Sequence, residues 1–217
     1  MEEIRNDAKR LAYVNLFAPL ALMVLSLFSL GTLATIRIDG IKWHVLFMAI
    51  VEIVIFVPYF MLWFNFLESM RKGYESNETM STAVKFGKAA LIIKIIAIII
   101  GALASIVVVT GKSMFAGTVN VGLLGMSPNS RVDYIFSSLS MLGYVLTAVM
   151  YLLFSENTES KSSMKYLTIA LTVLPVVVYS TTTRTESSYL WGIIQIGYYL
   201  IEFLFLYRIY KGYEFKS

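Results

Sequence analysis

Cysteine is absent from this chain of 217 residues, and histidine occurs once, as His44. Without cysteine, the chain forms no disulfide and offers no thiolate for an iron–sulfur cluster, a zinc site or nucleophilic catalysis. One histidine is too few for two-histidine haem ligation or for a histidine-rich copper or zinc site built from this chain alone. We therefore expect no metal and no cofactor, and the sequence favours a protein that is not an enzyme.

Charge is also scarce, since 15% of the residues are charged compared with about 25% in soluble domains. The apolar fraction is 58% and the mean hydropathy is +0.72. An apolar core of about 30 Å is crossed by roughly 20 helical residues, and the chain has six apolar runs of about that length. We predict an all-α integral membrane protein. Residues 1–217 form a single bundle, and the transmembrane helices lie at approximately 11–36, 45–66, 89–109, 134–154, 166–183 and 189–210.

Six spans place both termini on one side of the membrane and pair the helices into three hairpins, with the longest connections at 67–88 and 110–133. Twelve of the 18 Lys and Arg residues flank the helices on the side of the termini, five lie on the opposite side, and Lys94 lies within a span. The excess of cations predicts cytoplasmic N- and C-termini in a multi-pass protein of the cell membrane. Cations spread beside helix ends indicate contact with anionic lipid, not nucleic acid.

Two helix ends carry related sequences, Arg71-Lys72-Gly73-Tyr74-Glu75 and Tyr210-Lys211-Gly212-Tyr213-Glu214. One interpretation is a repeated hairpin, and the other is two helices that end on the same glycine cap. The Gly-rich segment 112–131 also has two interpretations, a connection and a cover over the outer mouth of the bundle. The sequence does not decide either question.

Three charged residues fall inside the apolar runs, namely Glu52, Lys94 and Glu202. A charge at the centre of a bilayer costs at least about 2.5–3.5 kcal/mol, so such residues turn inward and often mark a site. The depths of Lys94 and Glu202 match, which predicts an interaction between them. We expect a buried polar network or a proton or ion pathway formed by Glu52, Tyr59, Lys94, Gln195, Tyr199 and Glu202. A purely structural network, with Lys94 reaching the membrane surface, is the alternative.

Small residues recur every four positions at Ala97, Gly101 and Ser105. This spacing lets a second helix approach closely. The partner is a helix of the same chain, a second copy or another membrane subunit, and the spacing does not distinguish them.

The stretch Phe86-Gly87-Lys88-Ala89-Ala90-Leu91-Ile92-Ile93, which leads from a polar segment into an Ile-rich helix, resembles uncharacterised multi-helix membrane proteins of crenarchaea. The absence of Cys and the frequent use of Ile, Tyr, Ser and Thr are similar too. The resemblance implies an archaeal-like membrane protein and brings no activity.

Two functions follow as hypotheses from these features. The first is a non-catalytic integral subunit, or an assembly or stabilising factor, of a larger membrane complex. The second is a small transporter or proton- or ion-conducting protein that uses Glu52, Lys94 and Glu202. The expected partners are the lipid bilayer and other membrane subunits or further copies of the chain.

We expect reporter fusions at Lys216 and within segment 110–131 to label opposite sides of the membrane, because six spans separate these positions by an odd number of crossings. The measurement is reporter activity in cells, with a fusion at Arg5 as a control that matches Lys216. Labelling of Lys216 and segment 110–131 on the same side would contradict six spans.

Overall fold

Helices make up almost all of the structure. The computed structural model describes residues 1–28, 37–38, 41–109, 131–159, 162–184 and 188–216. The elements in these ranges are α1 (Glu2–Phe28), β1 (Arg37–Ile38), β2 (Ile41–Lys42), α2 (Trp43–Gly73), α3 (Glu78–Val109), α4 (Arg131–Glu156), α5 (Ser163–Arg184) and α6 (Ser188–Tyr210). The two short strands form an antiparallel pair that the sequence did not predict, with Arg37 opposite Lys42.

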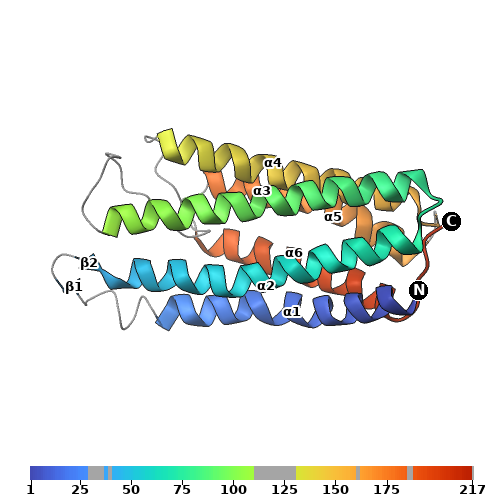
Figure 1. Ribbon diagram of the computed structural model, residues 1–217, viewed down its shortest axis with the longest axis horizontal. Coiled ribbons are helices and arrows are strands. Elements are labelled where there is room, and N and C mark those ends of the chain that lie inside the picture. The colour runs from blue at the N-terminus through green and yellow to red at the C-terminus, as the bar shows by residue number, and fades with distance from the viewer. Residues whose placement is uncertain (29–36, 39–40, 110–130, 160–161, 185–187, 217) are drawn as a thin grey trace.

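The six helices run alternately up and down, and both termini lie at the same end of the bundle (Figure 1). Each helix packs against its neighbours in the sequence, and α1 also packs against α6. The three expected hairpins are present as contacting pairs, but α2 also packs on α3 and α4 on α5. The helices therefore form a closed ring, and we call the end that holds both termini the terminal end.

The expected long connection at 67–88 is wrong. The α2 helix continues to Gly73 and α3 begins at Glu78, so only a short turn separates them. Asn77 caps α3, because its Oδ1 accepts a hydrogen bond of 2.9 Å from the Met80 N–H. Hydropathy located the apolar part of each helix but missed the polar turns beyond it, which continue the same backbone hydrogen bonding.

The related sequences around Gly73 and Gly212 do not form the same cap. Gly212 has a φ of 99°, and the Tyr213 N–H donates to the Arg208 carbonyl while the Gly212 N–H donates to that of Ile209. This pattern is a Schellman cap, which requires the left-handed conformation that glycine adopts easily. Gly73 instead lies within α2. The repeated-hairpin interpretation stays a prediction.

Apolar side chains cover the outside of the ring. Large hydrophobic residues are exposed on all six helices, for example Phe17, Val54, Ile96, Leu142, Val173 and Leu204. Within the described residues, two helical segments are long and apolar enough to cross a membrane, Ile53–Gly73 and Ser138–Glu156, and Ser163–Val177 is a shorter apolar helix. These features weakly indicate association with a membrane.

The C-terminal segment, Lys211–Lys216, folds back over the terminal end. The Phe215 N–H donates to the Tyr74 hydroxyl at 2.9 Å, and the Lys216 N–H donates to the Asn157 carbonyl at 2.9 Å. The Asn77 amide in turn donates to the Lys216 carbonyl at 2.9 Å. Burial raises the pKa of the Tyr74 phenol. The ring of Phe215 is buried and closes this end of the interior.

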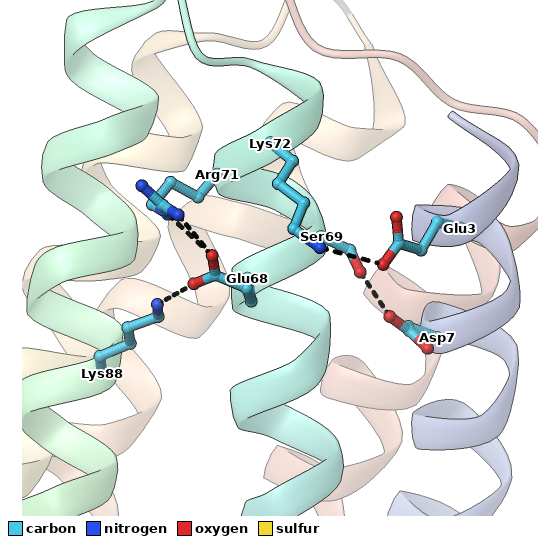
Figure 2. Close-up of polar contacts among 7 residues, drawn as sticks. All are labelled: Glu3, Asp7, Glu68, Ser69, Arg71, Lys72 and Lys88. Carbon is cyan, nitrogen blue, oxygen red and sulfur yellow. Dashed lines mark hydrogen bonds and ion pairs between the residues drawn. The ribbon is translucent and has the colours of Figure 1, made fainter.

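Polar contacts brace the helices at the terminal end (Figure 2). Glu68 of α2 accepts hydrogen bonds from Arg71 on the same helix and from Lys88 of α3. On the other side of α2, the Ser69 hydroxyl donates to Asp7 of α1 at 2.5 Å. These contacts are partly exposed, so solvent weakens each of them. Together they link α1, α2 and α3 side by side.

We expect Gly87→Leu to destabilise the bundle by about 1–3 kcal/mol, because overpacking of a filled interior costs about this much. A Cβ atom at Gly87 of α3 would lie 2.5 Å from the Met150 sulfur and 2.9 Å from a Leu67 methyl group. Gly197→Leu is the matched control, since no atom lies within 4 Å of a Cβ at Gly197. The measurement is the thermal unfolding midpoint in detergent. Equal midpoints for the two variants would contradict tight packing at Gly87.

Candidate functional site: a buried carboxyl network

The carboxyl group of Glu202 lies in the interior of the ring and is 2% exposed. Its Oε1 atom accepts hydrogen bonds from the hydroxyl of Tyr151 at 2.6 Å and from that of Tyr198 at 2.8 Å. Its Oε2 atom lies 3.1 Å from the hydroxyl of Tyr59. All three hydroxyl contacts are buried, so the carboxyl group exchanges its water for tyrosine hydroxyls.

Asn15 extends this network to α1. The hydroxyl of Tyr59 donates to the Asn15 Oδ1 atom at 2.7 Å, and the Asn15 amide nitrogen donates to the backbone carbonyl of Tyr199 at 2.9 Å. Asn15 is fully buried. The network therefore connects α1, α2, α4 and α6 by side chains that meet inside the ring.

Local sequence explains why these groups meet. Tyr198 and Glu202 are four residues apart on α6, so their side chains lie on the same face of that helix. Tyr59 of α2 and Tyr151 of α4 point toward that face because the outer faces of their helices are apolar. Polar groups of α1, α2 and α4 thus meet at the inward face of α6.

Lys94 of α3 lies between α3 and α4. Its Nζ atom is 5.3 Å from the centroid of the Tyr144 ring, a distance typical of a cation–π contact. Gly143 makes room for it, since a Cβ there would be 3.1 Å from the Lys94 Cγ atom. Lys94 and Glu202 interact electrostatically, but within the described part of the chain no ion pair shorter than 4 Å joins them.

Aromatic rings fill the interior between Glu202 and the terminal end. The ring of Tyr151 contacts that of Phe205 at 5.4 Å, edge to face, and Phe205 stacks on Phe154 at 5.9 Å. The Phe154 ring lies 5.6 Å from that of Phe215. These phenylalanines are fully buried or nearly so. On this side, a series of buried aromatic rings in contact therefore lies between the carboxyl network and the terminal end.

The structure brings together part of the residue set expected from the sequence. Tyr59 and Glu202 contact each other directly, and Tyr199 takes part through its backbone carbonyl. Lys94 contacts Tyr144 and not Glu202 directly. The side chains of Glu52, Gln195, Gly101 and Ser105 lie outside the described residues. Ala97 is 4% exposed, so this member of the small-residue face is covered within the bundle.

Sequence reasoning did not include Asn15, Tyr151 and Tyr198 in the site. An amide inside an apolar helix is a signal that could have identified Asn15. Tyr198 precedes Glu202 by four residues and is as well placed on the helix as Tyr199, so spacing alone did not choose between them. Tyr151 lies seven residues after Tyr144, a spacing that places both on one face of a helix, but the sequence does not show its contact with α6.

Metal binding finds no support in this region. Among the described residues, no group of three or more His, Asp or Glu side chains lies close enough together to hold a metal ion.

Comparisons with protein-family models, curated proteins and solved structures found no significant match to this chain.

We expect Tyr151→Phe to lower the free energy of unfolding by about 1 kcal/mol, because it removes one buried hydrogen bond to Glu202. Tyr166→Phe is the matched control, since Tyr166 of α5 is 67% exposed, and its effect should stay within about 0.5 kcal/mol. Unfolding in detergent, followed by circular dichroism, measures both. A Tyr151→Phe variant as stable as the control would show that the hydroxyl contributes nothing.

Proposed function

We propose that this protein is a six-span integral membrane protein that moves protons or a small cation, with Glu202 as the central binding group. One contrast carries the proposal. Glu202 is 2% exposed inside the ring, while Val54 on the outside is 64% exposed. A buried ionisable group inside a bundle with an apolar exterior is the arrangement expected in lipid, where inward ionisable groups mark pathways.

The proposal uses two groups on the path. Glu202 offers a carboxyl group that takes up and releases a proton, and Lys94 supplies a second ionisable group farther from the terminal end. Tyr144 lies seven residues from Tyr151 on α4, which corresponds to about 10 Å along the helix. Lys94 contacts Tyr144, so the two ionisable groups lie at successive levels of the interior. The cytoplasmic location of the termini belongs to the same proposal and rests on the distribution of Lys and Arg.

A non-catalytic subunit or assembly factor is the second candidate. Its support is the exposure of large apolar side chains on every helix, because helices of a partner could cover these faces as well as lipid does. Purification in mild detergent separates the candidates. A stoichiometric partner chain favours the subunit, and a stable protein without one favours the transporter.

We expect purified protein in liposomes to dissipate an imposed pH gradient faster than empty liposomes, and Glu202→Gln to reduce this flux at least tenfold. Glutamine keeps the size and polarity of the side chain but cannot release a proton. Glu156→Gln is the control, because Glu156 is exposed at the terminal end of α4. An internal pH-sensitive dye measures the flux. A wild-type rate equal to that of empty liposomes would reject the transport proposal.

A further inference from the structure

Only one assignment of donors and acceptors fits the hydrogen bonds around Asn15. The backbone carbonyl of Tyr199 can only accept, so the Asn15 amide nitrogen must face it, at 2.9 Å. The Asn15 Oδ1 atom then faces Tyr59, and this amide oxygen can only accept a hydrogen bond. The hydroxyl hydrogen of Tyr59 therefore points to Asn15, at 2.7 Å.

Tyr59 has no second hydrogen for Glu202. Its hydroxyl oxygen lies 3.1 Å from the Glu202 Oε2 atom, and a hydroxyl carries one hydrogen and two acceptor positions. A carboxylate oxygen at this distance would face another oxygen with no hydrogen between them. The contact becomes a hydrogen bond only when the hydrogen belongs to Oε2.

We infer that Glu202 binds a proton in this conformation, carried on Oε2 and donated to the hydroxyl oxygen of Tyr59. The other oxygen, Oε1, is then the carbonyl oxygen, and it accepts from Tyr151 and Tyr198. In this arrangement the acid hydrogen has an acceptor, and Oε1 accepts two hydrogen bonds. This inference deepens the proposed function, since it names the proton as the ligand of the Glu202 site.

The cations of the described residues lie farther from the carboxyl group than the three tyrosine hydroxyls do. Lys94 of α3 makes no ion pair with Glu202 in the described part of the chain and contacts Tyr144 of α4. From α5, Lys165 donates to the Ser155 carbonyl at the terminal end, and Tyr166 is exposed. Tyr59, Tyr151 and Tyr198 thus contact the carboxyl directly, while Lys94 and Tyr144 act from a greater distance.

Loss of the proton has a structural consequence. An ionised Oε2 would need a hydrogen from Tyr59, and Tyr59 can supply it only by leaving Asn15. The proton released from Oε2 goes to water that reaches the site. The hydrogen bonds through Tyr59 and Asn15 cannot carry it away, because they end at a backbone carbonyl. Proton release and the bond between α1 and α2 are therefore coupled.

Infrared spectroscopy of the full chain in detergent tests the inference. We expect a carboxylic-acid C=O stretching band at neutral pH that Glu202→Gln removes and that Glu156→Gln leaves unchanged. Absence of this band from the wild-type protein would overturn the inference. The measurement needs no transport, so a protonated Glu202 without proton flux in liposomes would reject only the proposed function.

The hydrogen-bond direction is tested by Asn15→Leu. This variant frees the Tyr59 hydrogen for Glu202, so the acid band should disappear at a proton concentration about tenfold or more higher than in the wild type. Greater burial by leucine alone would shift the loss in the opposite direction, and that outcome would overturn the assigned direction. If Asn15→Leu does not fold, Tyr59→Phe replaces it. That variant should move the band to higher frequency, because Oε2–H loses its acceptor, and an unmoved band would contradict the assignment.

Discussion

A carboxyl group that gives up water must find hydrogen-bond partners in the protein, and this requirement organises the interior of the bundle. Glu202 has tyrosine hydroxyls from α2, α4 and α6 around it, and Asn15 adds α1 through Tyr59. If one of these helices shifted, a buried polar group would lose its partner, at a cost of about 1–3 kcal/mol. The relative positions of four helices thus depend on one side chain.

The two ends of the interior are built differently around this group. Toward the terminal end, the interior is apolar and aromatic, and Phe215 of the C-terminal segment completes it. Lys94 and Tyr144 lie on the other side of Glu202. This asymmetry is compatible with the proposed transport of protons, because a site open to both sides at once would let protons pass freely.

Apolar patterning of the sequence predicted the existence and the number of the helices in the described part of the chain, and the inward position of Glu202 followed from the cost of a charge in lipid. Patterning did not predict how far the helices extend. The turns around Gly73 and Glu78 are polar, and their helical structure rests on backbone hydrogen bonds and on the Asn77 cap. Patterning also did not predict the cap at Gly212, because the left-handed φ that distinguishes it from Gly73 is a property of the folded backbone.

The sequence by itself determined that Glu202 needs partners, since the charge and the apolar surroundings are both local properties of α6. The tertiary structure alone decided which groups serve. Asn15 and Tyr151 are separated from Glu202 by long stretches of chain. Tyr151 contacts it directly and Asn15 is linked to it through Tyr59, because α1 packs on α6 and the ring closes. Lys94 was expected at the depth of Glu202, yet it contacts Tyr144 farther from the terminal end. The reason is that α3 begins at Glu78, well before its apolar run, so hydropathy alone did not fix where the Lys94 side chain lies.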